Sequence, residues 1–415
     1  MKAHLFGELL PADVAQRRLW RASRPVDRLE TVAVENAFGR VAAASVRARV
    51  AVPPFPRANW DGYAVRSEDL RSASRRQPRN LRIVGEVFAE QTFRGTVGPG
   101  EAVAIATGGR VPEGADAVAI FEEVEHDRRS VTVRAPVRPG ARLAPVGDDL
   151  ARGTLLVRRG ERLGPAALGS LAATGVARLR VYARPVVAVV PNGNELRPPG
   201  GRLGPGEIYE SNNAALAGFL TAAGCEPRLF SPVADDPRKI EASLRRALRT
   251  SDLVLSTGGS SVGEHDHLPR LFPRIGELLF HGVAVRPGKP TLAARAGDRL
   301  LIGLPGHPTS CLLNMHWLVL PVLRRLARLP GPGWTVRPGR LAGPPLDAAP
   351  GFTTVVPLRI DGEQVRSTFH GSSAIRSLRA AEAFAFLPPG RRRVPTGARL
   401  DVCVLDPPLG PPARG

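Results

Sequence analysis

Apolar runs and helical repeats alternate along residues 185–330. The runs at 186–190 and 253–255 are short and continuous, which is typical of buried strands. Between them, apolar residues recur at every fourth position from Ile240 to Leu248 and predict a helix with one buried face. Further strands are expected at 228–230, 279–285 and 300–304, with a long helix from Pro308. This alternation predicts an α/β domain with a doubly wound parallel sheet.

The flanking regions have shorter periodic segments. Helical spacing at 7–20 predicts an amphipathic helix, and a short helix is expected at 34–43. Short β segments separated by turn residues predict a mostly-β domain inserted at 51–146, and the chain becomes β again after residue 330, as in a small barrel or sandwich. The expected domains are residues 1–50 together with 147–184, the insertion at 51–146, the α/β domain at 185–330 and a C-terminal β domain at 331–415.

Charge does not point to nucleic acid. The formal net charge is +20, which invites that interpretation. However, lysine occurs only at Lys2, Lys239 and Lys289, so the excess is arginine and indicates coding bias. The arginines are scattered, mostly in pairs, without an aromatic-interleaved stripe. We therefore expect general attraction to anionic ligands and no nucleic-acid partner. An oligonucleotide affinity that does not change with salt would remove the possibility of nucleic-acid binding.

Cysteine usage and hydropathy indicate a soluble, cytoplasmic protein. Cys225, Cys311 and Cys403 are far apart and form no CxxC motif, as expected of buried thiols in a reducing compartment. No signal peptide is indicated at the start of the chain. The most apolar long stretch, 311–323, is too short and too mixed to span a bilayer, so no membrane partner is expected.

Three glycine-rich loops follow predicted strands. The first lies in DLVLSTGGSSVGEHD at 252–266, where small residues let backbone N–H groups close on an anion. RPGKP at 286–290 and GLPGHP at 303–308 are the others. Because open α/β sheets bind ligands at the carboxyl ends of their strands, we expect a phosphorylated substrate there. The candidate ligand-binding residues of the first loop are Ser256, Thr257, Gly258, Gly259, Ser260 and Gly263.

Acidic residues follow the same strands. Glu195, Asp235 and Asp266 come after successive strands and would converge to hold Mg²⁺ against a phosphate. Any one of them taken alone is better explained as a helix N-cap or a solvated loop charge, and the set of three is what favours a metal site. Asp235 is the most open to that alternative, because it lies just before the expected helix at 237–250.

Basic residues at the other two loops suit an oxyanion. Arg286 and Lys289 could neutralise a phosphate, or be ordinary surface charges. His307, between Gly306 and Pro308, precedes a helix N-terminus that attracts anions, or is simply a loop residue.

Two positions in the inserted domain are more ambiguous. Asp61, in a Trp-Asp-Gly-Tyr context, is conspicuous but could be a turn residue. Thr107, followed by two glycines, could present N–H groups to an anion or end a β segment.

Ordered motifs along nearly the whole chain resemble the MoeA family, the molybdopterin molybdenumtransferases, which include the E domain of gephyrin. The motifs are NWDGYAV (59–65), IATGGRVPEGADAV (105–118), VGDDLARG (146–153), NGNEL (192–196), GEIYESN (206–212), the pair at 235–236, the three glycine-rich loops and SSAIRSLRAAEAFAFLPPG (372–390). Several motifs in the family's order are far more specific than any isolated match.

The resemblance implies an elongated N-terminal segment, an inserted β domain, a MogA-like α/β domain and a C-terminal β-barrel. It also implies a homodimer whose sites lie between the α/β domain of one subunit and the inserted domain of the other. Such enzymes take adenylylated molybdopterin, cleave the adenylate with Mg²⁺ and molybdate present, release AMP and leave molybdenum on the dithiolene. A MogA-type adenylyltransferase is a possible partner.

The resemblance also assigns roles to residues. Glu195, Asp235 and Asp266 would form the metal and phosphate end, whereas Asp61 and Thr107 would reach across the dimer. The positions that match the family's functional residues are Asp61, Thr107, Asp149, Glu195, Asp235, Asp266 and Arg286.

Several positions depart from the family pattern. Asn194 replaces an acid, Gly282 stands where a lysine is expected, Arg286 replaces a lysine and His307 replaces an asparagine. Asp61 also follows Ala-Asn-Trp in place of Ser-Ala-Met. These changes leave open a divergent paralogue that binds the pterin or a partner protein without turnover. Adenylyl transfer to molybdopterin is a third possibility, disfavoured because a MogA-type protein is essentially the α/β domain alone.

Overall fold

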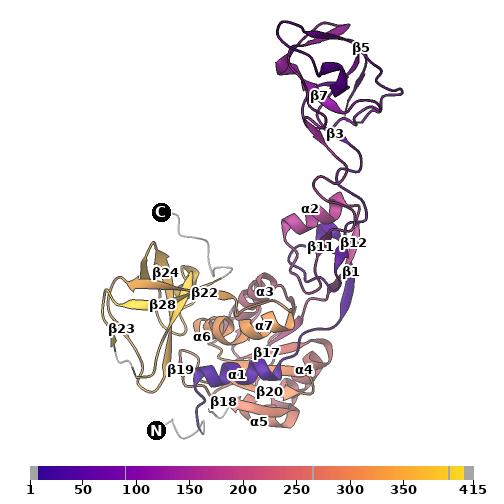
Figure 1. Cartoon of the computed structure of the whole chain (residues 1–415). Helices are drawn as coiled ribbons and strands as arrows, with labels where there is room; N and C mark the ends of the chain where they lie inside the picture. Colours follow the sequence, from indigo (N-terminus) through magenta and orange to yellow (C-terminus); the bar gives the residue numbers. More distant parts are fainter. Residues whose placement is uncertain (1–7, 89, 264–265, 391–392, 406–415) are drawn as a thin grey trace. The chain divides into compact units, whose positions relative to one another are not determined.

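The computed structural model describes residues 8–88, 90–263, 266–390 and 393–405 (Figure 1). The chain divides into two compact units. The first comprises Met1–Glu30 and Tyr182–Gly415, and the second comprises Thr31–Val181. Each is described by itself below.

A six-stranded sheet forms the centre of the first unit, in the order β16-β13-β17-β21-β20-β18. Its parallel strands are β13 (Val186–Pro191), β16 (Glu226–Leu229), β17 (Leu253–Thr257) and β21 (Arg299–Leu304). At one edge, β20 (Leu292–Ala296) and β18 (Glu277–His281) run antiparallel. The predicted parallel sheet is thus confirmed for four strands. The strand β20, which the sequence analysis did not predict, runs the other way because the tight turn around Gly297 makes a hairpin with β21 and is too short for a crossover.

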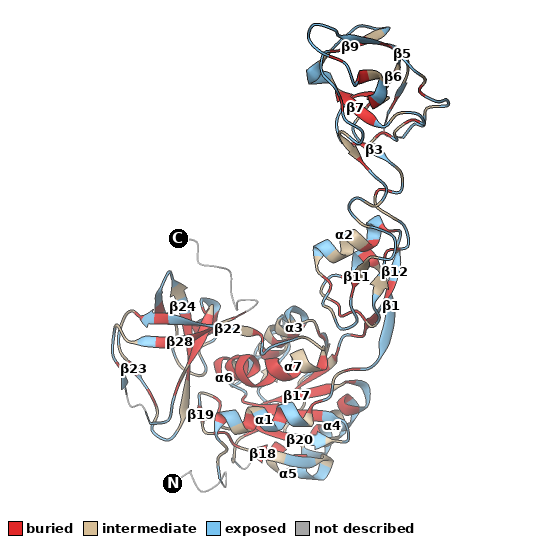
Figure 2. Cartoon of the chain, in the orientation of Figure 1, coloured by how far each residue is buried: buried red, intermediate tan, exposed pale blue. Residues whose placement is uncertain are grey.

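Helices cover both faces of this sheet, and alternate residues of β13 show why. Val187 and Val189 pack into one core and Ala188 and Val190 into another, as the two-residue period of a strand requires. The first core takes side chains from α1 (Ala12–Ala22), α3 (Asn212–Ala222), α6 (Pro308–Asn314), the π-helical turn η5 (Met315–Val319) and α7 (Leu320–Leu326). The second takes them from α4 (Pro237–Thr250) and α5 (Leu268–Ile275). Figure 2 shows the buried strands between these helices.

The C-terminal β domain belongs to the same unit, and its strand pairings run in a closed ring. Going round, they join β24 (Thr353–Asp361), β25 (Gln364–Ser367), β22 (Trp334–Leu341), β28 (Arg399–Leu405) and β26 (Ala383–Leu387), which pairs with β24 again. A two-residue strand of the α/β domain, β19 (Val285–Arg286), pairs with β24. Shorter elements are β14 (Leu196–Arg197), β15 (Ile208–Tyr209), β23 (Leu346–Asp347), β27 (Arg393–Val394) and α8 (Arg376–Arg379).

The second unit holds the predicted β insertion. Its sheet has the order β7-β4-β6-β5-β9-β8. The bounds are β4 (Gly62–Val65), β5 (Arg79–Val87), β6 (Glu101–Ile105), β7 (Ala117–Ile120), β8 (Val124–His126) and β9 (Ser130–Val133), with short helices η3 (Ser67–Leu70) and η4 (Phe121–Glu123). Gly62 is required in β4 because an added Cβ would overlap the carbonyl oxygen of Ala119 on β7.

The rest of the second unit consists of short paired strands and one helix. These are β1 (Leu29–Ala33), β2 (Val46–Arg47), β3 (Arg57–Ala58), β10 (Leu143–Ala144), β11 (Leu155–Val157), β12 (Arg178–Tyr182) and α2 (Pro165–Ala173). The helix expected at 34–43 is only a single 3₁₀ turn, η2 (Val34–Asn36), because Gly39 adopts a positive φ and ends it. Among the described residues of either unit, no helix has both the length and the hydrophobicity needed to cross a membrane.

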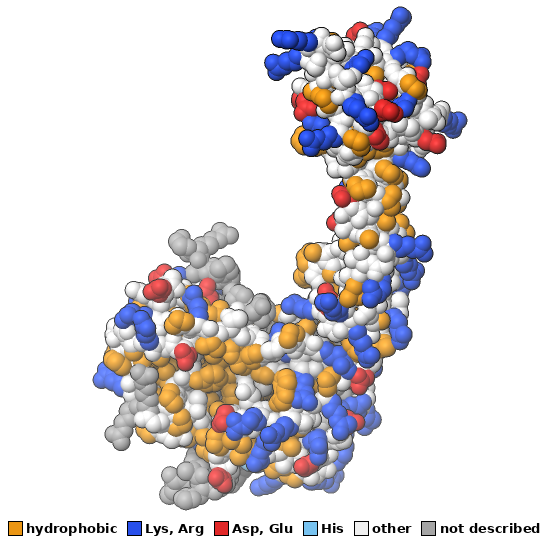
Figure 3. All heavy atoms as spheres, viewed as in Figure 1, with side chains coloured by type: hydrophobic (Ala, Val, Ile, Leu, Met, Phe, Trp, Pro, Cys, Tyr) orange, Lys and Arg blue, Asp and Glu red, His pale blue; other side chains and the backbone are white. Residues whose placement is uncertain are grey.

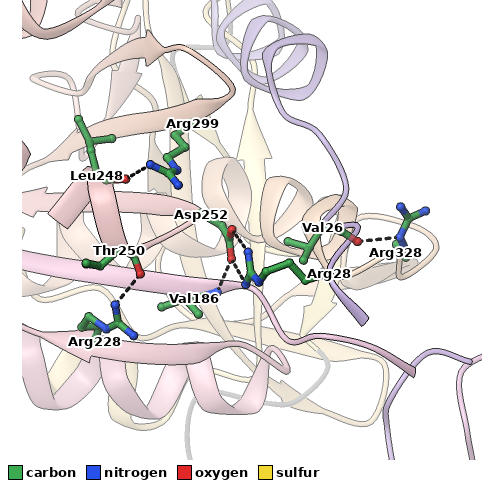
Figure 4. A network of polar contacts seen from close by, with 9 residues as sticks. All are labelled: Val26, Arg28, Val186, Arg228, Leu248, Thr250, Asp252, Arg299 and Arg328. Atoms are coloured by element: carbon green, nitrogen blue, oxygen red, sulfur yellow. Dashed lines mark hydrogen bonds and ion pairs between the residues drawn. The ribbon is translucent and has the colours of Figure 1, made fainter. Parts of the chain in front are cut away.

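A polar network fixes the edge of the α/β sheet where β17 begins (Figure 4). Arg28 makes two hydrogen bonds to the carboxylate of Asp252, at 2.6 and 2.8 Å, and the backbone N–H of Val186 donates to the same carboxylate at 2.8 Å. Burial acts to raise the pKa of Asp252, but these hydrogen bonds outweigh it and lower the pKa. The carboxylate therefore stays charged in a largely buried position.

Replacing this carboxylate should measurably destabilise the first unit. Asp252→Asn leaves Arg28 without its bidentate partner, and we expect a loss of about 2 kcal/mol in the free energy of unfolding at neutral pH. Urea denaturation measures it. The matched control is Asp298→Asn, which breaks a pair with Arg24 between side chains 73% and 69% exposed and should change stability by less than about 0.5 kcal/mol. Equal losses would contradict the assignment.

Candidate functional site

The carboxyl ends of the four parallel strands lie at one edge of the sheet. Their registers pair Val189 with both Leu229 and Leu255, and Thr257 with Leu304. The loops that follow them therefore share this edge, as predicted. They contain Asn194 and Glu195 after β13, Asp235 after β16, residues 258–263 after β17, and His307 after β21.

The first glycine-rich loop approaches its neighbours too closely for side chains. Gly258 and Gly259 have φ of 84° and 61°, a region that favours glycine. A Cβ on Gly258 would overlap the carbonyl oxygen of Asn192, and one on Gly306 would lie 3.4 Å from the Cα of Gly258. The β17 and β21 loops are therefore packed backbone to backbone.

The hydroxyl of Ser256 fixes the end of the strand. It accepts a hydrogen bond from the side-chain amide of Asn192 at 2.6 Å, and Ser256 is fully buried. The backbone N–H of Asn192 donates to the carbonyl of Thr257 at 2.8 Å. Thr257 and Ser260 are also buried, whereas Gly263 is exposed. Ser256 thus supports the loop from within.

Asp235 is not a helix cap. The N-cap of α4 is Asp236, whose carboxylate accepts from the backbone N–H groups of Arg238 and Lys239. Asp235 instead forms a reciprocal pair with Asn194: its carboxylate accepts the Asn194 N–H at 3.1 Å, and its own N–H donates to the Asn194 side chain at 3.0 Å. Asp235 is therefore not the N-cap of α4. Asn194, which replaces an acid of the family pattern, holds Asp235 in position through these two hydrogen bonds.

The other two acids are Glu195, which directly follows Asn194, and Asp266, which follows the first glycine-rich loop. Glu195 is exposed, and its carboxylate lies over Gly193, where a Cβ would meet it at 2.6 Å. Asp266 accepts the backbone N–H of Gly263 at 2.8 Å and so closes the far end of the first glycine-rich loop. Burial lowers the pKa of His281, while a hydrogen bond with the backbone of Ser260 and the charge of Asp266 oppose this shift.

The described residues of the site do not form a preformed set of metal ligands. Within the described ranges, which omit residues 264 and 265, no three His, Cys, Asp or Glu side chains are grouped to hold an ion. Mg²⁺ usually takes one or two protein carboxylates together with substrate phosphates and water. The structure does not bring Glu195, Asp235 and Asp266 together as one three-ligand group, and their assignment as metal ligands stays a prediction.

A cavity of about 820 Å³ lies between the α/β domain and the C-terminal β domain of the first unit. Arg286, Lys289 and His307 line one side of it. Arg286 lies 4.5 Å from the centre of the Phe352 ring, and His307 Nδ1 is 3.2 Å from the hydroxyl of Ser372. The size suits a small-molecule ligand, and the exposed Arg286 guanidinium gives the wall a positive charge.

Buried polar contacts hold the second loop, 286–290, in place. Thr291 donates to the carbonyl of Gly288 at 2.7 Å, and Asn314 donates to Thr291 at 2.6 Å. The indole N–H of Trp317 donates to Asn314 at 2.8 Å. Side chains from α6 and η5 thus set the position of this part of the cavity wall.

The sequence analysis missed the opposite wall of the cavity. That wall comes from the C-terminal domain, and the segment 372–390 had been noted only for its resemblance. No local pattern in the sequence connects that segment with the loops of the α/β domain. The missed lining residues include Ser310, Asp347, Ser367, Phe369 and Ser372.

Asp61 and Thr107 lie together in the second unit. They lie just outside the paired strands β4 and β6, where Gly62 is opposite Ile105. The carboxylate of Asp61 accepts the backbone N–H and the hydroxyl of Thr107 at 2.6 and 2.9 Å, and these two bonds lower the pKa of Asp61. Asp149 is exposed in a turn, where its backbone N–H donates to the carbonyl of Val52.

Comparisons with known proteins cover almost all of the chain. Residues 10–175 match the model of the MoeA N-terminal region (domain I and II), residues 188–325 that of a probable molybdopterin binding domain, and residues 341–405 that of the MoeA C-terminal region (domain IV). The molybdopterin molybdenumtransferase of Bacillus subtilis (strain 168) is 31% identical over 405 residues, covering 95% of this chain and 94% of its own.

Solved structures agree with this assignment. The molybdopterin biosynthesis MoeA protein from Pyrococcus horikoshii has a TM-score of 0.82 at 33% identity, with 96% of this chain and 99% of that chain covered. A second structure, of a MoeA protein from Pyrococcus horikoshii OT3, has a TM-score of 0.79 at 27% identity. The match covers 96% of this chain and 100% of that chain. On the ordered motifs, the fold and these relatives, the chain belongs to the MoeA family.

Proposed function

We propose that this protein is a molybdopterin molybdenumtransferase, which inserts molybdenum from molybdate into adenylylated molybdopterin and releases AMP. The observation that carries the proposal is the cavity of about 820 Å³ whose walls hold Arg286, Lys289 and His307, beside the loops at the carboxyl ends of the parallel strands. An oxyanion and a phosphorylated ligand could bind next to each other there.

Each group of residues would have a separate task. Backbone N–H groups of the loop at 258–263 would bind the phosphates, and Arg286 and Lys289 would neutralise the molybdate oxygens. Glu195, Asp235 and Asp266 would hold Mg²⁺ together with the substrate. When bound, Mg²⁺ would neutralise charge on the phosphates that join the two halves of the adenylylated substrate.

Two departures from the family pattern are compatible with turnover. Arg286 keeps a cation at its position. Gly282 has a φ of 91°, and its N–H donates to the carbonyl of Thr291 at 2.8 Å, so a glycine suits the backbone there. These observations favour an active enzyme over a divergent paralogue that binds without turnover.

The decisive test is AMP release by the purified protein. With adenylylated molybdopterin, Mg²⁺ and molybdate, we expect AMP and a cofactor that restores activity to a molybdenum-free apoenzyme. Omission of either Mg²⁺ or molybdate should stop both readouts. Bound substrate that stays intact under saturating molybdate would refute the proposal and support the paralogue.

We also propose that the enzyme is a cytoplasmic homodimer in which Asp61 and Thr107 of one subunit serve the α/β domain of the other. The support is the family resemblance together with the Asp61–Thr107 pair. A MogA-type adenylyltransferase is the proposed supplier of the adenylylated substrate.

Mixing two inactive variants tests the shared site. Asp61→Asn and Asp235→Asn should each leave at most about one hundredth of the turnover. After unfolding and refolding together, half of the dimers would be mixed and each would contain one intact site, so activity should return to about one quarter of that of the unaltered dimer. Co-refolding each variant with itself is the control. A mixture as inactive as its components would mean that each subunit builds its own site.

A further inference from the structure

An aromatic groove lies on the first unit, away from the loop residues described above. It holds about 300 Å³ and lies between α1, η5 and the C-terminal β domain. Trp317 and Phe386 form part of it, with ring centres 6.3 Å apart, and Trp334 forms another part. Figure 3 shows hydrophobic side chains gathered where the C-terminal β domain meets the α/β domain.

A second apolar hollow of about 580 Å³ also borders α1, and Gln16 lines both. Gln16 donates to the carbonyl of Trp317 at 2.7 Å. One helical turn further along α1, Trp20 is 40% exposed and contributes to the second hollow, together with Pro321 and Pro332. We refer to the two hollows together as the α1 groove, whose lining includes Trp317 and Trp334 in the first hollow and Trp20 in the second.

Grooves lined by aromatic rings with polar groups at the edge are suited to proline-rich segments. Such segments adopt an extended left-handed helix with three residues per turn, and they lose little conformational entropy on binding. The chain contains one directly after its last described strand: residues 406–415 read DPPLGPPARG, in which prolines at 408 and 411 form a P-x-x-P pattern.

The position of the last strand gives this segment immediate access to the α1 groove. Leu405, the last residue of β28, is paired with Trp334 on β22. Trp334 itself lines the groove. Ten residues in the extended proline helix span roughly 30 Å, whereas Gln16 and Trp20 are only about 6 Å apart along α1. The segment is therefore longer than the separation of Gln16 and Trp20 along α1.

We propose that residues 406–415 bind in the α1 groove of their own chain. The segment would cover Trp334 and Trp20 and connect α1 with the C-terminal β domain. Because that domain also supplies one wall of the cavity that contains Arg286, the bound segment would brace the two domains that form it. This inference does not depend on the proposed function.

Fluorine NMR can test the proposal, because the chain has only four tryptophans. The full chain and a variant ending at Leu405 would be labelled with 5-fluorotryptophan and assigned by single Trp→Phe replacements. We expect the Trp334 and Trp20 resonances to shift on truncation. Trp60, in the second unit, is the internal control and should not move. A variant of full length with alanine at 407, 408, 411 and 412 should reproduce the truncated spectrum.

A binding measurement shows whether this segment or another molecule occupies the α1 groove. The peptide DPPLGPPARG should bind the truncated protein about tenfold more tightly than the full chain, because the tethered segment competes at an effective concentration near millimolar. The same peptide with alanine for its four prolines is the control and should not bind. Equal affinity for both proteins, or tryptophan resonances that respond to dilution and not to truncation, would overturn the proposal; the latter would identify a second copy as the occupant.

Discussion

The Asp235→Asn variant is expected to release AMP about 10² to 10³ times more slowly than the unaltered chain, because it removes a charge placed to stabilise the reacting phosphates and their metal ion. The fold should be unaffected. An asparagine oxygen at this position can still accept the N–H of Asn194, which the carboxylate now accepts at 3.1 Å. Single-turnover measurement of AMP, with saturating substrate and molybdate, isolates the chemical step.

The neighbouring residue offers a closely matched control. Asp236→Asn changes the charge by the same amount one position away, and asparagine caps a helix about as well as aspartate. This variant should keep both the activity and the stability of the unaltered chain. If both variants lost activity equally, the effect would come from the general charge of the loop, and Asp235 would have no specific role.

Acid should destabilise the first unit through His316, which is 3% exposed in the π-helical turn and packs edge-on against Phe219. Burial lowers the pKa of His316 from 6.5 to about 3. The unfolded chain therefore binds a proton at a pH where the folded chain does not. The free energy of unfolding is unaffected above pH 6.5 and falls below it, by roughly 2 to 3 kcal/mol on going to about pH 4.5. Urea denaturation across this range measures the slope.

His316→Leu should remove most of this pH dependence. Among the described residues, neither ring nitrogen of His316 has a hydrogen-bond partner. At neutral pH the leucine variant should therefore be more stable by about 1 to 2 kcal/mol. His370→Leu, at an exposed position, is the control and should keep the slope. An unchanged slope in the His316 variant would show that other groups dominate the response to acid.

Local sequence patterns predicted most of the fold. They did not predict contacts between residues that are distant in the chain. The continuous apolar runs predicted β13, β17 and β21, because a strand that is buried on both faces consists mostly of apolar residues. The strand β20 itself was not predicted, and its antiparallel pairing with β21 depends on the short turn around Gly297. Positions at strand ends, such as Asp235 and Gly258, were found because the topology alone brings them to one edge.

The opposite wall of the cavity could not be found in this way. Ser372 meets His307 across 65 residues of sequence, and no local pattern encodes that contact. Likewise, only the structure distinguishes Asp236, which caps α4, from Asp235, which faces Asn194. The metal-binding roles of Glu195, Asp235 and Asp266 remain predictions that the experiments above address.

The short strand β19 limits how such enzymes can be recombined. Val285 and Arg286 pair with Thr353 and Thr354 of β24, so the sheet of the last domain includes two residues that precede β24 by more than sixty positions. A hybrid built by grafting residues 331–405 from a relative would lack its native edge partner. Exchange of the C-terminal β domain would succeed only if residues 285–286 were transferred together with it.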